Sequence, residues 1–264
     1  MNTENRHFAK PFVDSRHCNN TLPKINRMGN QTSILSQNKA ARLAGLLFLV
    51  AMVTGLFAEF YVRFPSTLVV SGDAVKTARN IVAHERLYRI GIANNIITFA
   101  IDVALIWALY ILLRPVNRNL ALLAVFFRLV ETTLACGAII NSYVAMQFVS
   151  DAASLKAFDT NQIQTLSILH TTYALSFVVV AIFLGLGSMI FNYLLFKSKY
   201  IPKLLAGWGV FASLLLLISQ FAIIVFPAIE KIIIPACYAP IALDEIALGF
   251  WLLLKGAKIP KAEA

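Results

Sequence analysis

The sequence predicts an all-α, polytopic transmembrane bundle of about six helices. Hydrophobic residues make up 59% of the 264 positions and charged residues only 14%, whereas a soluble domain is about 45–50% apolar and about a quarter charged. Several apolar stretches reach the roughly 20 residues that a helix needs to cross a hydrocarbon core. No strand-like alternation favours a β-barrel. We therefore expect the lipid bilayer as a partner and the cell (inner) membrane as the location.

The chain divides into three parts. Residues 1–38 are polar and basic and contain no apolar stretch, so we expect a disordered tail and not a secretory signal peptide. Residues 39–257 hold the membrane helices, and residues 258–264 form a short C-terminal tail.

Six apolar segments follow one another within the membrane domain. In chain order they cover about 41–62, 90–113, 120–148, 163–196, 203–226 and 240–254. The fourth is longer than one span requires, so its first turns should project beyond the hydrocarbon core. Pro227, Pro235 and Pro240 are expected to punctuate the link before the sixth segment, because proline removes a backbone donor and disfavours a helix interior.

The longest loop, residues 64–89, contains a predicted amphipathic helix. Ser71-Gly72-Asp73 is typical of a helix start, in which the Asp73 side chain can cap free backbone N–H groups. Apolar residues then recur at helical spacing, while basic residues face other ways. The apolar residues are Val75, Ala78, Ile81 and Val82. We expect this helix to lie at the membrane surface in the first outer loop.

The distribution of basic residues predicts the orientation. Most of the 23 Lys and Arg residues lie in the N-terminal tail, around 114–118 and 197–203, or after the last span. Basic residues concentrate on the cytoplasmic side of membrane proteins, so both termini are predicted to be cytoplasmic. These positions account for much of the net charge of +10. No basic face interleaved with aromatic residues is present, and we expect no nucleic-acid partner.

Charged residues interrupt the second and third segments near their centres. Asp102 lies 14 residues before Val116, the centre of the turn between the two segments, and Arg128 and Glu131 lie 12 and 15 residues after it. In an antiparallel hairpin of helices, a rise of about 1.5 Å per residue places all three groups at the same depth. That depth is close to the middle of a bilayer.

The sixth segment adds two more acids, Asp244 and Glu245. Glu245 lies ten residues before Lys255, and Arg128 lies ten residues after Arg118. If the two segments are antiparallel, their depths agree to within about one turn, near 5 Å. Two uncharged residues share a helical face with Asp102. The predicted polar network comprises Asn95, Thr98, Asp102, Arg128, Glu131, Asp244 and Glu245.

Two functions are compatible with this network. Charges at mid-membrane cost roughly 2.5–3.5 kcal/mol each and normally face a bundle interior or a water cavity. Four carboxyl groups and one guanidinium sum to −3 when all are ionised, so we expect at least one acid to be protonated or to meet a cation. This excess favours small-solute or ion/proton-coupled transport. The alternative is a structural or sensory membrane component in which Arg128 and one carboxylate only fix helix packing.

Catalytic and cofactor signals are absent from the sequence. No HExxH motif and no glycine-rich phosphate loop occurs, so we do not expect an enzyme. Cys18, Cys136 and Cys237 have no paired spacing, and no metal site is expected. His84 and His170 both fall on the predicted outer side, where shared haem binding is a remote alternative. We expect no cofactor.

Several motifs occur in an order that resembles a known family. They are Ala41-Arg-Leu-Ala-Gly-Leu-Leu47, Ser71-Gly-Asp-Ala74, Tyr110-Ile-Leu-Leu-Arg-Pro115, Phe127-Arg-Leu-Val-Glu131 and Trp251-Leu-Leu-Leu-Lys-Gly256. As a set they resemble the bacterial membrane family called domain of unknown function 4386, over about residues 38–257. The resemblance implies a helical membrane architecture and recurrent positions at Arg128, Glu131 and Glu245. It implies no activity.

Overall fold

The computed structural model describes residues 22–58, 68, 70, 74–153 and 160–259, and in these ranges the chain is helical throughout apart from short connections. The elements are α1 (Leu22–Phe57), α2 (Ala74–Ala83), α3 (Glu85–Leu113), α4 (Arg118–Ala153), α5 (Thr160–Ser198), α6 (Lys203–Val225), the 3-10 turn η2 (Pro227–Ile229) and α7 (Glu230–Lys255). The predicted all-α class is confirmed.

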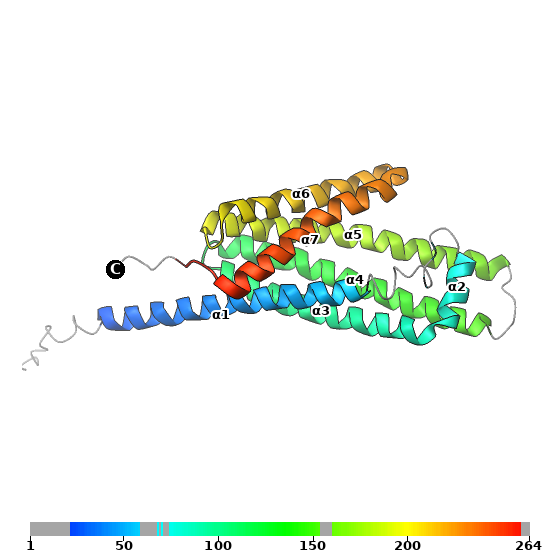
Figure 1. Ribbon diagram of the computed structural model, residues 1–264, viewed down its shortest axis with the longest axis horizontal. Helices are drawn as coiled ribbons and strands as arrows, with labels where there is room; N and C mark the ends of the chain where they lie inside the picture. The colour runs from blue at the N-terminus through cyan, green and yellow to red at the C-terminus, as the bar shows by residue number, and fades with distance from the viewer. Residues whose placement is uncertain (1–21, 59–67, 69, 71–73, 154–159, 260–264) are drawn as a thin grey trace, which may run out of the picture.

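The six long helices form a closed ring (Figure 1). Each packs against two neighbours, in the order α1, α3, α4, α5, α6, α7 and back to α1. Each of these six is long and apolar enough to cross a membrane. Large apolar side chains such as Trp107, Ile140 and Leu254 are exposed, whereas the charged side chains of Arg128, Glu131 and Asp244 are buried among the helices. This inverted distribution suits a lipid surround, because a soluble protein rarely exposes so much contiguous apolar surface.

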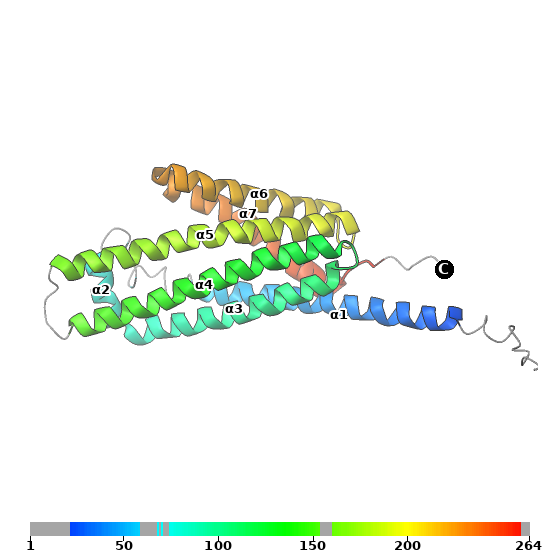
Figure 2. The ribbon, with the colours of Figure 1, turned by 180° about the vertical axis from the view of Figure 1, so that it is seen from behind.

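The connections alternate between the two ends of the bundle. The start of α1, the α3–α4 turn, the α5–α6 turn and the end of α7 lie at one end, while α2 and the α6–α7 turn lie toward the other (Figures 1 and 2). Because the spans in the described part of the chain number six, this alternation places the start of α1 and the end of α7 at the same end of the bundle. The end that holds the basic turns is the one predicted to face the cytoplasm, and that orientation stays a prediction.

A helix occupies the stretch between the first two spans where an amphipathic helix is predicted. This helix, α2, packs against α4 and α5 toward the end of the bundle opposite the α3–α4 turn (Figure 1). Ala78 and Ile81 on its apolar face are buried, but Val82 is 37% exposed. The expected cap, Asp73, lies outside the described residues. Placement of α2 at a membrane surface stays a prediction.

Thr77 ties α2 to the loop that precedes it. Its Oγ1 accepts a hydrogen bond from the N–H of Val70 at 2.9 Å and donates one to the carbonyl of the same residue at 3.2 Å. Both the donor and the acceptor of one loop residue are therefore satisfied by a single buried hydroxyl.

The first helix begins earlier than the sequence predicts. Since α1 starts at Leu22, residues 22–38 are helical where a disordered tail is expected; residues 1–21 lie outside the described residues. Extending an existing helix adds one hydrogen bond per residue without a new nucleation cost. Asn38 also reaches the other end of the chain, because its Oδ1 accepts a hydrogen bond from the N–H of Ala257 at 3.1 Å.

The last helix also begins earlier than predicted. Pro235 and Pro240 lie inside α7, and of the three prolines only Pro227 falls in the link between the two helices. Proline is tolerated in membrane helices because neighbouring helices help to satisfy the local backbone groups. Trp208 of α6 contacts α7 at this point, where its indole N–H donates to the carbonyl of Pro240 at 3.1 Å.

Small residues bring α1 and α7 into close contact. A Cβ at Gly45 would collide with the backbone N of Leu253 and would lie 2.7 Å from the carbonyl oxygen of Gly249. Ala41 and Ala44 on α1 are fully buried. In membranes, small residues at helix crossings let the backbones approach and gain van der Waals contact. This contact closes the ring beside the charged residues of α7.

Candidate functional site

The interior of the ring holds a cluster of buried charged side chains. Arg128 and Glu131 of α4 are each 6% exposed. Nη1 of Arg128 lies 3.2 Å from Oε2 of Glu131, one helical turn away. On the facing helix α3, Oδ1 of Asp102 lies 3.9 Å from Nη2 of Arg128. The structure thus brings together the three residues that the hairpin spacing places at equal depth.

The contact between Arg128 and Glu131 is an ion pair without an aligned hydrogen bond. Despite their 3.2 Å separation, Nη1 of Arg128 and Oε2 of Glu131 find no hydrogen-bond partner within the described part of the chain. A buried polar atom without a partner costs about 1–3 kcal/mol. The cluster therefore retains unused hydrogen-bonding capacity inside the bundle.

Gly187 of α5 makes room for the arginine. A Cβ at this position would lie 2.6 Å from Cγ of Arg128 and 3.3 Å from the carbonyl oxygen of Ala124. A larger residue would therefore have to displace the arginine stem. Because glycine is present, α5 packs directly over α4 while the guanidinium lies between the helices.

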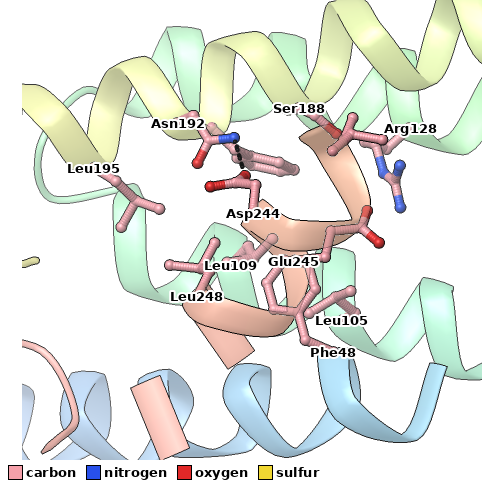
Figure 3. Close-up of a pocket in the computed structure, with 12 residues that line it drawn as sticks. Phe48, Leu105, Leu109, Arg128, Ser188, Asn192, Leu195, Asp244, Glu245 and Leu248 are labelled. Atoms are coloured by element: carbon pink, nitrogen blue, oxygen red, sulfur yellow. Dashed lines mark hydrogen bonds between the residues drawn. The ribbon is translucent and has the colours of Figure 1, made fainter. Parts of the chain in front are cut away.

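The two adjacent acids of α7 face different partners. The carboxylate of Glu245 points toward the guanidinium of Arg128 (Figure 3), and the two groups interact electrostatically. Asp244 is 2% exposed, and its Oδ2 accepts a hydrogen bond from Nδ2 of Asn192 on α5 at 3.1 Å. Glu245 thus extends the arginine cluster, whereas Asp244 is held by an uncharged amide.

A small cavity lies between these groups (Figure 3). Its polar lining consists of Arg128, Ser188, Asn192, Asp244 and Glu245, and the remaining walls are apolar residues of α1, α3, α5 and α7. About 20 Å³ is open to the centre of a water-sized sphere, which is room for about one water molecule. A solute with several heavy atoms does not fit in this conformation.

Ser188 and Asn192 belong to the site although the sequence analysis does not select them. The centre of α5 carries no charged residue. The sequence therefore gives no mid-membrane charge that would point to this helix, as Asp102, Arg128 and Asp244 point to α3, α4 and α7. The usable signal is the spacing of four residues between Ser188 and Asn192, which places both on one helical face.

Asn95 and Thr98 are not among the residues that line the cavity, and neither are Asp102 and Glu131. Thr98 donates its hydroxyl to the carbonyl of Asn94 at 3.0 Å, as threonine commonly does toward the preceding turn of its own helix. Asn94, the neighbour of the predicted residue, reaches across to α1 and donates to the carbonyl of Thr54 at 2.9 Å. Asn94, which the predicted network does not include, therefore contributes to the contact between α1 and α3.

The residues that the structure describes contain no group of three or more His, Cys, Asp or Glu side chains arranged to hold a metal ion. His84 is exposed beside α2, where its Nδ1 lies 3.2 Å from the carbonyl oxygen of Asn80. The side chain of His170 lies outside the described residues, so haem binding by the two histidines is not tested.

Six apolar helices around buried charges define the class: this is a multi-pass membrane protein. Residues 43–256 match the family described as Domain of unknown function (DUF4386), and the chain belongs to that family. It is also similar to an uncharacterised protein of Archaeoglobus fulgidus, with 27% identity over 167 residues, 60% of this chain and 79% of the relative. No solved structure matches the chain.

Proposed function

We propose that this is an ion- or proton-coupled membrane protein and that its charged cluster takes up protons. The observation that supports the proposal is an imbalance of charge. Of the residues that line the cavity, Arg128 alone is basic, and it already pairs with Asp102 and Glu131. Glu245 faces the same arginine, and Asp244 adds a fourth carboxyl group at the wall of the same cavity. Ionisation of every acid would leave a charge of −3 inside the bundle, which is costly away from water.

A proton fits the available space better than larger ligands do. The cavity of about 20 Å³ holds about one water molecule. Calcium and magnesium take six or more oxygen ligands at defined distances, and the described residues offer no such group. Protons neutralise carboxylates without needing room of their own. In this proposal a small solute or ion crosses the membrane in a separate step, and proton binding by the cluster is coupled to that step.

A structural or sensory component is the second candidate. Arg128 contacts acids on α3 and α4 and packs against Gly187 of α5. One buried arginine therefore links three helices, which is sufficient to fix their packing. In that case the protonation of the acids does not change while the bundle stays folded. Asp244 would then serve only to join α7 to α5 through its hydrogen bond with Asn192.

Infrared spectroscopy across a pH series tests the proposal, because a protonated carboxylic acid has a carbonyl band distinct from that of a carboxylate. Above about pH 6, where solvent-exposed carboxyl groups are already ionised, the purified folded protein should show an acid band that grows as the pH falls and shrinks reversibly as it rises. Of the two variants Asp244→Asn and Glu245→Gln, each of which removes one carboxyl group beside the cavity, at least one should reduce this titrating band. An acid band that stays constant above about pH 6 while the protein remains folded would refute proton uptake.

A further inference from the structure

We infer that Asp244 is the residue that holds the exchangeable proton and that it shares this proton with the side-chain amide of Asn192. The inference rests on the proposed function and names the atom at which the proton binds. It begins with the hydrogen bond from Nδ2 of Asn192 to Oδ2 of Asp244, which measures 3.1 Å. Both residues are buried, with 5% and 2% of their surfaces exposed.

That hydrogen bond leaves two acceptors without a donor. Only the NH2 group of an amide can donate to a carboxyl oxygen, so the amide oxygen of Asn192 is left for another partner. Oδ1 of Asn192 and Oδ1 of Asp244 are both buried and find no hydrogen-bond partner among the described side chains and backbone groups. Figure 3 shows these two oxygens on the same side of the hydrogen bond that joins the residues.

One proton on Oδ1 of Asp244 gives both of these unpaired oxygens a hydrogen-bond partner. The resulting O–H donates to Oδ1 of Asn192, and the acid and the amide then form two hydrogen bonds in opposite directions. When Asp244 is ionised, the two oxygens are both acceptors and repel each other. A water molecule in the cavity can donate to both, but it leaves the buried negative charge without compensation, which is expensive in an apolar setting.

The surroundings of Asp244 favour its neutral form. The cavity walls from α1, α3 and α5 are uncharged, and the charged groups that face the cavity are Arg128 of α4 and Glu245 of α7. Arg128 is already paired with two acids. Glu245, when ionised, opposes a second negative charge at the adjacent residue.

Helix α6 holds the amide in place. A Cβ at Gly209 would lie 2.5–2.6 Å from the amide atoms of Asn192. Glycine at this position therefore lets the side chain of Asn192 lie between α6 and α7, where it meets Asp244. The pair joins α5 to α7 across the cavity, and its two hydrogen bonds depend on the presence of one proton.

The variant Asp244→Asn tests the assignment. Its new amide can donate to Oδ1 of Asn192 and accept from Nδ2, so it reproduces both hydrogen bonds of the protonated pair without a titratable group. We expect Asp244→Asn to fold and to lose one titrating acid band from the infrared spectrum. Glu230→Gln, at the start of the same helix and not among the cavity-lining residues, is the matched control and should leave the titrating band unchanged.

Stability gives a second readout. If Asp244 is protonated in the folded state and ionised in the unfolded chain, the folded state binds one more proton, so stability falls as the pH rises. Relative to Asp244→Asn, the folding equilibrium constant of the wild type should fall by up to about tenfold per pH unit. Equal pH dependence in the two proteins would contradict the assignment.

Isotope labelling of the wild type keeps the test decisive if the variant fails to fold. Aspartate labelled with heavy carbon in its side-chain carboxyl should shift the titrating band. A titrating band that shifts only with labelled glutamate would overturn the assignment to Asp244 and leave the proposed function intact. If the wild type shows no titrating acid at all, the assignment and the proposed function both fail.

Discussion

Replacement of Arg128 by leucine should destabilise the folded protein by about 3–5 kcal/mol, the range measured when one partner of a buried ion pair is removed. Among the residues that the structure describes, Arg128 is the only cation within 4 Å of Asp102 and Glu131, at 3.9 and 3.2 Å. Leucine fills part of the space beside Gly187 but leaves the two acids without an opposite charge. Denaturant unfolding in detergent micelles measures the loss.

A second substitution separates loss of charge pairing from loss of packing. Arg128→Leu combined with Glu131→Leu should recover part of the stability, because one of the stranded carboxyl groups is then removed. Arg114→Leu is the control, since Arg114 is exposed in the α3–α4 turn and should change stability by no more than about 0.5 kcal/mol. Strictly additive losses in the double variant would show that the two side chains are not energetically coupled.

Gly45→Ala should give the second large effect, near the upper end of the roughly 1–3 kcal/mol that overpacking costs. The added methyl group would meet backbone atoms of Gly249, Leu252 and Leu253 on α7. Backbone cannot rotate away as the tip of a side chain can, so α1 and α7 would have to separate. We expect a lower melting temperature in detergent and weaker protection of α7 from hydrogen exchange.

The same helix supplies a matched control for this substitution. A Cβ at Gly55 would meet nothing within 4 Å. Gly55→Ala should therefore be neutral or slightly stabilising, by up to about 1 kcal/mol, because alanine is the better helix former. If the two alanine variants had equal stability, the close crossing of α1 and α7 would be wrong.

The parts of the fold that depend on local pattern were predictable from the sequence. Length and apolarity alone indicate six spans, and a constant rise per residue places Asp102, Arg128 and Glu131 at one depth because a short turn joins their helices. The predicted starts of α1 and α7 were both too late, and these two errors also have a local cause. Residues 22–38 carry no apolar pattern, and the prolines of α7 are ordinary helix breakers only when the helix is in water.

The part of the site that depends on long-range packing was not predictable in the same way. Asp244 meets Asn192 because α5 and α7 both border the cavity and Gly209 leaves room for the amide. Helical spacing identifies which residues share a face, but it does not say which helix that face meets.

The two proposed roles of the cluster differ in whether its protons exchange with water while the bundle stays folded. Proton coupling requires this exchange, whereas a purely structural role does not. The direct measurement is the infrared acid band after transfer of the folded protein from ordinary to heavy water. Proton coupling predicts that the band shifts to lower frequency while the backbone amides of α4 and α7 are still protected. A band that shifts only together with those amides would mean that the acids are sealed until the protein unfolds, and would contradict proton uptake by the folded protein.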